Sequence, residues 1–121
     1  ALSELTRVLA HGGLLCIEYE RSQSAEFLFT KNYNSNIFSN IYDYNGQQHK
    51  LWLYSDSYIV QFLKQSHIKI VHKDYFHGVS SLVARFTRNE PKASKMALYD
   101  RNFPWLLKFT AHNCMLWGIK C

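Results

Sequence analysis

Two glutamates at the end of a predicted strand are the residues of this sequence best placed for chemistry. Residues 14–17 form an unbroken apolar run, and Glu18, Tyr19 and Glu20 follow it directly. Ligands of open α/β sheets bind at the carboxyl ends of strands, so these residues are candidates for a substrate site. A carboxylate there can take a proton from a substrate. The alternative for Glu18 is a solvated strand end.

His49 is the second candidate base, although its polar neighbours also suit an ordinary surface histidine. The other histidines give no metal site, because His67, His72 and His77 recur every five residues and neighbours in such a series point to opposite faces of a strand. There is no Cys-x-x-Cys pair, which argues against a zinc ribbon. We therefore predict no metal centre.

Residues 21–54 are rich in asparagine and aromatic side chains. Asparagine competes with helix and sheet for backbone hydrogen bonds, so an irregular or briefly helical segment is expected, with a turn at Asn45-Gly46. Such a segment beside a strand end is typical of a lid or binding loop, and the alternative is an ordinary surface excursion. Its aromatic side chains either line a substrate pocket or form the lid's own core. The candidates are Tyr33, Tyr42, Tyr44 and Trp52.

The opening residues predict a helix, a glycine turn and the strand that carries Glu18. Apolar residues at helical spacing form one stripe, which consists of Leu2, Leu5, Val8 and Leu9. Gly12-Gly13 ends the helix, because glycine adopts positive φ without steric cost. The apolar run that follows is typical of a strand covered on both faces, and Cys16 within it is expected to be buried.

The remaining elements are read from periodicity and capping signals. In chain order they are a helix at 55–65, a strand at 67–75, a helix at 79–88, helical turns within 93–110 and a strand at 112–120. Ser55 or Ser57 caps the first of these helices. Residues 79–88 also permit a strand after a hairpin at Gly78. Pro104 is expected to open a second helix within 93–110.

Composition limits the class of protein. The 121 residues are 47% hydrophobic and 19% charged, which predicts one globular domain. No apolar run approaches the roughly 20 residues that cross a bilayer, and no signal peptide is visible. Three cysteines, an odd number, indicate a reducing, cytoplasmic location. The net charge of +5 is spread along the chain, which favours a mildly basic surface over a nucleic-acid footprint.

The opening stretch resembles class I S-adenosylmethionine-dependent methyltransferases. Their pattern Leu-x-x-x-x-Arg-Val-Leu-x-x-Gly-Gly-x-Leu is carried here by Leu2, Arg7, Val8, Leu9, Gly12, Gly13 and Leu15. Residues 52–63 resemble the family's next helix, and residues 99–107 and 115–120 resemble its tail, which ends Gly-x-Lys. This sequence has Ala10-His11 where the family usually has Lys-Pro, and residues 66–68 replace its Ala-Gly-Phe.

This resemblance implies an α/β fold, the C-terminal half of a Rossmann-like methyltransferase sheet. Helices would pack on strands near 14–20, 67–75 and 112–120, the family's fifth, sixth and seventh strands. The single partial domain 1–121 would comprise a helix-turn-strand at 1–20, the insert or lid at 21–54, and a helix, strand, helical segment and terminal strand at 55–121.

The implied activity is methyl transfer from S-adenosyl-L-methionine to a small-molecule acceptor. Its base would be Glu18 or His49. Its substrate contacts would be Tyr19, Glu20 and the aromatic candidates of residues 21–54. The family's glycine-rich cofactor turn and its ribose-holding carboxylate are absent, so no cofactor-binding residue is assigned and the isolated chain is expected to be inactive. The expected partner is the missing N-terminal half or a second copy. The alternative is a non-catalytic module that binds through an exposed sheet edge.

Overall fold

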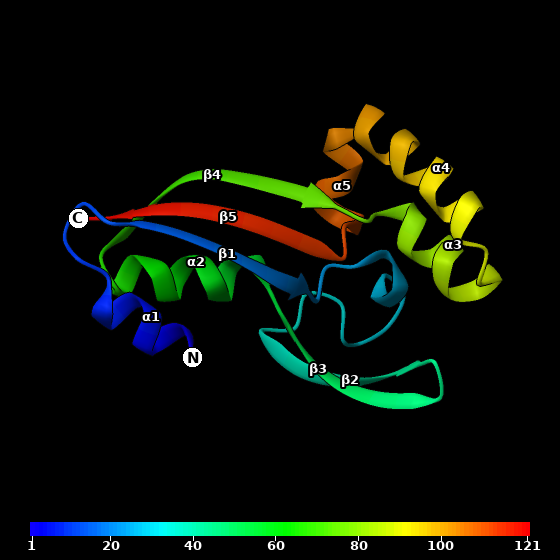
Figure 1. Ribbon diagram of the computed structural model, residues 1–121, viewed down its shortest axis with the longest axis horizontal. Coiled ribbons are helices and arrows are strands. Elements are labelled where there is room, and N and C mark those ends of the chain that lie inside the picture. The colour runs from blue at the N-terminus through cyan, green and yellow to red at the C-terminus, as the bar shows by residue number, and fades with distance from the viewer.

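A five-stranded open mixed sheet with helices forms the fold, in a computed structural model that describes the backbone of residues 1–121 and every side chain except those of Tyr44, Arg85 and Glu90. The strands are β1 (Leu14–Arg21), β2 (Ile37–Tyr44), β3 (Gln47–Tyr54), β4 (Ile68–Phe76) and β5 (Asn113–Lys120). The helices are α1 (Leu2–Val8), α2 (Asp56–Gln65), α3 (Val79–Thr87), α4 (Glu90–Asn102) and α5 (Pro104–Thr110), with a short 3₁₀ turn at Ala25–Phe27. Figure 1 shows their arrangement.

The strands lie in the order β2-β3-β1-β5-β4. The terminal strand β5 runs antiparallel to both β1 and β4, so these two strands point the same way and end on the same side of the molecule (Figure 1). Strand β3 pairs in parallel with β1 through only two residue pairs, Glu20 with Leu53 and Arg21 with Tyr54. The expected strands near 14–20, 67–75 and 112–120 are therefore confirmed.

Helices α1 and α2 contribute to the core that covers one face of the sheet. Leu63 of α2 and Leu116 of β5 are fully buried there, and each such leucine stabilises the fold by about 1.5–3 kcal/mol. The Ser55 Oγ atom accepts a hydrogen bond from the Tyr58 amide at 3.2 Å, so Ser55 is the cap of α2. That cap agrees with one of the two serines expected from the sequence.

The opposite face of β1 is uncovered, which corrects two expectations. Leu14 is 64% exposed and Cys16 is also exposed, while Leu15 and Tyr19 are buried. A short apolar run has no periodicity that distinguishes one covering layer from two, so the prediction of a strand buried on both faces was wrong.

Residues 37–54 form a β-hairpin, whereas an irregular or briefly helical segment was expected. Asn45 and Gly46 both have positive φ, 51° and 77°, as two-residue hairpin turns require. Strands β2 and β3 then pair in continuous antiparallel register from Ile37–Tyr54 to Tyr44–Gln47. The weak propensity of asparagine is outweighed by this ladder, because strand propensity depends strongly on cross-strand context.

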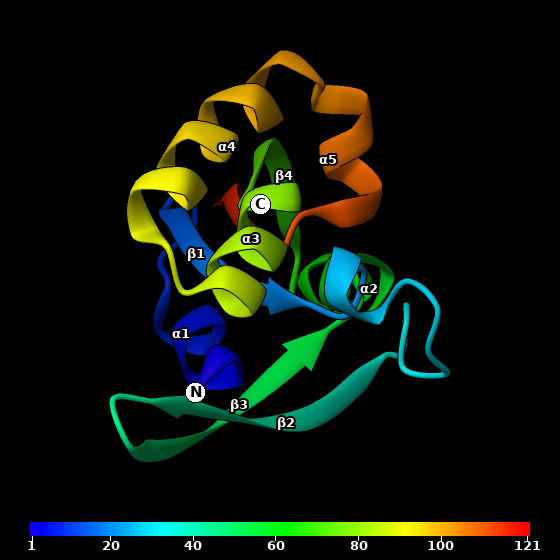
Figure 2. The same cartoon turned by 90° about the vertical axis from the view of Figure 1, so that its right-hand side faces the viewer.

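Helices α3, α4 and α5 lie beyond the ends of β1 and β4 (Figure 1), and Figure 2 shows the molecule from their side. This helical cap comprises residues 79–110. The Asp100 carboxylate anchors it by accepting hydrogen bonds from the amides of Gly78, Val79 and Ser80, at 3.0–3.1 Å. Pro104 opens α5 and residues 79–87 are helical, as the sequence predicted.

Candidate functional site

A cleft of about 430 Å³ lies where β1 ends and β5 begins, beside β3. Its lining residues are Glu18, Tyr19, Glu20, Leu51, Trp52, Tyr54 and Asn113. Strand alternation places Glu18 and Glu20 on the same face of β1, the face away from α2. The cleft therefore combines two carboxylates, a carboxamide and aromatic rings at the carboxyl end of a strand.

Asn113 positions the Glu18 carboxylate. Its Nδ2 atom donates a hydrogen bond to Oε1 of Glu18 at 2.9 Å, across the antiparallel pair of β1 and β5. Asn113 lies directly opposite Glu20, so the contact to Glu18 is diagonal across the ladder. A carboxylate held in this way has a fixed orientation, which suits it to accept a proton from a bound molecule.

Glu20 has one carboxylate oxygen without a hydrogen-bond partner. Its Oε2 atom is buried without a hydrogen-bond partner and lies 3.7 Å from Nε2 of His112. The other ring nitrogen of His112 lies 3.2 Å from the Ser24 hydroxyl and 3.6 Å from a carboxylate oxygen of Glu26. Because Ser24 is completely buried, its hydroxyl is not reachable as a nucleophile, and this serine-histidine-glutamate group has no hydrolase geometry.

The α2-facing side of the same strand end holds an ion pair. Arg21, with no exposed surface, donates to both carboxylate oxygens of Asp56 at 2.9 and 2.8 Å. Its remaining donors reach the carbonyls of Leu107, Lys108 and Ala111 in and after α5. The guanidinium therefore ties the end of β1 to the start of α2 and to the helical cap.

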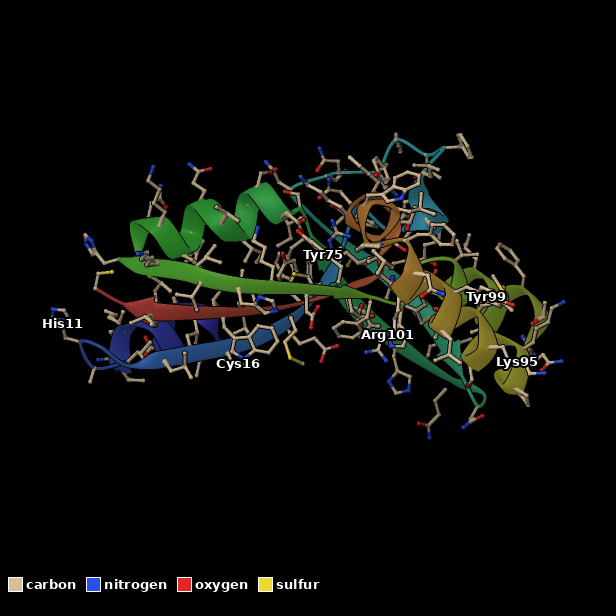
Figure 3. The ribbon with its side chains drawn as sticks, turned by 90° about the horizontal axis from the view of Figure 1, so that it is seen from above. His11, Cys16, Tyr75, Lys95, Tyr99 and Arg101 are labelled. Atoms are coloured by element: carbon tan, nitrogen blue, oxygen red, sulfur yellow. The ribbon has the colours of Figure 1, made fainter. Side chains whose placement is uncertain are left out.

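Two tyrosines complete this network. The hydroxyls of Tyr19 and Tyr75 donate to the two oxygens of Asp56, at 2.8 and 3.0 Å. The Arg21 guanidinium also lies over the Tyr75 ring, 4.4 Å from its centroid. Figure 3 shows Tyr75 at the end of β4, near the start of α2. Asp56 thus accepts four hydrogen bonds and has little capacity left for a ligand.

The network shifts the pKa of each member. Burial opposes the charged form of Asp56, but hydrogen bonds and the charge of Arg21 outweigh it, and the Asp56 pKa lies below its ordinary value. Burial would lower the pKa of Arg21, but Asp56 raises it. Burial and the nearby Asp56 charge raise the pKa of both Tyr19 and Tyr75. The ion pair therefore stays charged and the tyrosines stay neutral, which is the behaviour of a structural network.

The structure brings together four of the seven residues predicted for the site. Glu18, Glu20 and Trp52 line the cleft, and Tyr19 borders it while its hydroxyl bonds Asp56.

The other three lie elsewhere. The Tyr33 hydroxyl donates to the Phe109 carbonyl at 2.6 Å, the Tyr42 hydroxyl bonds the Glu26 carboxylate, and His49 is exposed on β3. The side chain of Tyr44 lies outside the described residues.

Sequence reasoning missed Leu51, Tyr54 and Asn113. Asn113 lies within the strand expected at 112–120 and begins β5, but its role depends on β5 lying antiparallel beside β1. No pattern in the sequence indicates that β5 is the neighbour of β1. Among the described residues, no group of three or more histidine, cysteine, aspartate or glutamate side chains could hold a metal ion.

Comparison with known proteins gives no family for this chain. No protein-family model matches the sequence, and no curated protein matches it. The arrangement of the strands and the chemistry of the cleft are therefore the observations from which a function is inferred.

Proposed function

We propose that the chain is the substrate-side part of an S-adenosylmethionine-dependent methyltransferase that acts on a small molecule. The observation that carries this proposal is the order β1-β5-β4, with the antiparallel terminal strand between two strands of common direction. The methyltransferase resemblance assigns these three strands, β1, β5 and β4, as the fifth, seventh and sixth of the family's sheet. A helix precedes β1 and another precedes β4, which also supports the resemblance.

The cleft supplies the acceptor side of the reaction. Its carboxylates would hold a molecule that carries a hydroxyl or amine, and Glu18, oriented by Asn113, would accept its proton. The Trp52 ring would pack against the body of the acceptor. Glu18 replaces His49 as the preferred base, because His49 does not line this cleft.

The residues present do not fit S-adenosylmethionine itself. A nucleoside cofactor is held where a strand passes through a glycine turn into a helix. In the described chain such a turn occurs at Gly78, between β4 and α3. There the amides of Gly78, Val79 and Ser80 already donate to Asp100. We therefore assign no cofactor contact to this chain.

A second candidate function is a non-catalytic interaction module. Strand β3 pairs with only the last two residues of β1, and no described strand pairs with residues 14–19 along that edge. An unpaired edge is a template for a strand of another polypeptide. Three exposed apolar side chains, Leu5 and Val8 of α1 and Leu14 of β1, add surface that a partner would cover.

Calorimetry distinguishes these candidates. S-adenosylmethionine is titrated into the chain alone and into the product of the whole reading frame that encodes it. We expect no heat from the chain alone, and binding with methyl transfer from the whole product. Tight binding by the chain alone would contradict the placement of the cofactor outside it. If neither sample binds and the chain is dimeric by light scattering, the interaction module is supported.

A matched pair of variants tests the base. Glu18→Gln in the whole product should lower kcat for methyl transfer by about 100-fold or more, the contribution of a general base, with cofactor binding retained. Glu4→Gln is the control, because Glu4 is exposed on α1 and bonded to Arg7. Equal activity of the two variants would show that Glu18 is not the base.

A further inference from the structure

The helical cap exposes an unusual amount of apolar surface for three short helices. Phe86 is 78% exposed and Trp105 67% exposed, and every helix of the cap contributes to this surface. The large exposed apolar residues are Phe86, Leu98, Tyr99, Phe103, Trp105 and Phe109. Such a gathering marks a surface that contacts something other than water.

Basic residues accompany this apolar surface. Residues 79–110 hold six of the fourteen Lys and Arg residues but only two of the nine acidic residues. One of those two is Asp100, whose oxygens are bonded to backbone amides inside the cap. The cap therefore carries most of the chain's net positive charge, although the charges looked scattered in the sequence.

The basic and apolar side chains share the outward sides of the helices. On α4, Lys92, Lys95 and Tyr99 lie at i, i+3 and i+7, and all are exposed. On α5, Trp105 and Lys108 are one turn apart and exposed. Figure 3 shows Lys95, Tyr99 and Arg101 on the cap, at the end of the molecule opposite His11.

An apolar cavity of about 290 Å³ lies within this surface, between α3, α4 and α5. Its lining residues are Val79, Met96, Tyr99, Asp100, Phe103, Leu106, Leu107 and Thr110. Two of them, Tyr99 and Phe103, are also among the exposed aromatic residues, so the cavity reaches the outer surface of the cap. The cap thus offers both an apolar recess and surrounding cations.

We propose that the helical cap binds the surface of an anionic lipid membrane. Aromatic and leucine side chains would enter the boundary between headgroups and acyl chains, and the cavity would take an acyl-chain end. Lys92, Lys95 and Lys108 would reach the lipid phosphates along their flexible stems. This is a peripheral contact, and no helix among the described residues is long and apolar enough to cross a bilayer.

Charge decides against a second copy of the chain as the occupant. Two caps brought face to face would oppose basic residues to basic residues, which costs affinity. Single-stranded nucleic acid also attracts cations and aromatic rings. Leu98, Phe86 and a cavity lined mainly by aliphatic and aromatic groups favour acyl chains over stacked bases.

Vesicle sedimentation tests the proposal. The probe is phosphatidylcholine vesicles with or without about 30% phosphatidylserine, at about 0.1 M salt. We expect at least about tenfold tighter binding to the phosphatidylserine vesicles, with weakening as salt is raised. Equal binding to both kinds of vesicle, or binding to a single-stranded oligonucleotide with none to vesicles, would overturn the proposal.

A charge-matched pair of variants locates the surface. Lys92→Glu with Lys95→Glu should weaken vesicle binding at least roughly thirtyfold, since each basic residue near an anionic surface contributes about fivefold. Lys64→Glu with Lys69→Glu changes the net charge equally but lies on α2 and β4, and should weaken binding by less than about threefold. Equal losses in the two variants would show that only net charge matters and would overturn the assignment to the cap.

The apolar contribution has its own control. Trp105→Ala should weaken vesicle binding roughly tenfold, as expected when part of a large aromatic side chain leaves the lipid. Phe29→Ala removes a side chain that is also exposed but lies outside the cap, and should leave binding unchanged. Both positions are solvent-facing, so thermal melting should show intact folding. Unchanged binding of Trp105→Ala would refute insertion of the cap.

Discussion

The two faces of β1, near its carboxyl end, differ in how far the hydrogen bonds of their polar side chains are satisfied by the protein. On the face toward α2, Arg21 and its partner Asp56 have almost every donor and acceptor satisfied by the protein. On the other face, Glu18 has Asn113 as a partner, and Glu20 has a buried oxygen with no hydrogen bond. The residues alternate along one strand, so only the surroundings of each face differ.

This difference distinguishes polar residues that stabilise the fold from polar residues that can bind a ligand. A saturated network has no capacity for a ligand, and its cost of burial is offset by internal bonds. The exposed Glu18 carboxylate accepts a hydrogen bond from Asn113 and retains acceptor capacity for a molecule in the cleft. The Arg21–Asp56 side therefore fits a role in stability, and we propose the Glu18–Glu20 side as the ligand-binding side. Four measurements test this contrast.

The largest effect is expected at Asp56. Asp56→Asn leaves the buried Arg21 charge without a counter-ion, so the free energy of unfolding should fall by about 3–5 kcal/mol. Urea unfolding measures this loss. Asp74→Asn, at an exposed position of β4, is the matched control and should change stability by less than about 0.5 kcal/mol. A loss below about 1 kcal/mol at Asp56 would mean that the network does not stabilise the fold.

Acid should remove the same contribution. The pKa of Asp56 is lowered in the folded protein, so its stabilisation is complete above the unfolded-state pKa of about 4 and is lost as pH falls through the folded value. The difference in unfolding free energy between wild type and Asp56→Asn should therefore shrink between about pH 5 and about pH 2. A difference that stays constant over this range would contradict the lowered pKa.

A smaller loss is expected at Tyr75. Tyr75→Phe removes one hydrogen bond to Asp56 but keeps the ring beneath Arg21, so we expect a loss of about 1–2 kcal/mol. The onset of acid unfolding should move to higher pH, because Asp56 loses a donor that lowers its pKa. Tyr58→Phe on α2, where the ring stacks on Tyr54, serves as control. Identical behaviour of the two variants would place Tyr75 outside the network.

The smallest effect is expected in the cleft. Glu18→Gln keeps an oxygen for Asn113, so the free energy of unfolding should stay within about 0.5 kcal/mol of wild type. Thermal or urea unfolding measures it. A loss above about 1.5 kcal/mol would make Glu18 a structural residue and remove the contrast between the two faces.

The sequence predicted much of the local structure. Ser55 caps α2, Pro104 opens α5, and the strands near 14–20, 67–75 and 112–120 form where apolar periodicity placed them. It failed for β2 and β3, where asparagine propensity argued against strands that the hairpin ladder stabilises. The sequence also predicted that both faces of β1 are covered. This was wrong, because a short apolar run does not show whether one face of a strand or both are buried.

The candidate site shows the same limit. Glu18, Glu20 and Trp52 were identifiable as polar or aromatic residues near strand ends, but Asn113 was not. Asn113 joins Glu18 from 95 residues along the chain. The pairing that brings them together depends on which strand lies beside β1, and local residue patterns carry no information about that neighbour.

The helices, the strands β1, β4 and β5, the turn at Asn45-Gly46 and the carboxylates at the end of β1 were predictable from sequence alone. These follow from short-range preferences of neighbouring residues. The tertiary structure was needed to show which side chains have their hydrogen bonds satisfied by the protein and which do not. Asp56 could be recognised as a favourable residue in the first turn of a helix, but its four hydrogen bonds come from Tyr19 and Arg21 of β1 and Tyr75 of β4. Long-range packing sets that environment, and it distinguishes the hydrogen-bonded face of β1 from the face that carries the cleft.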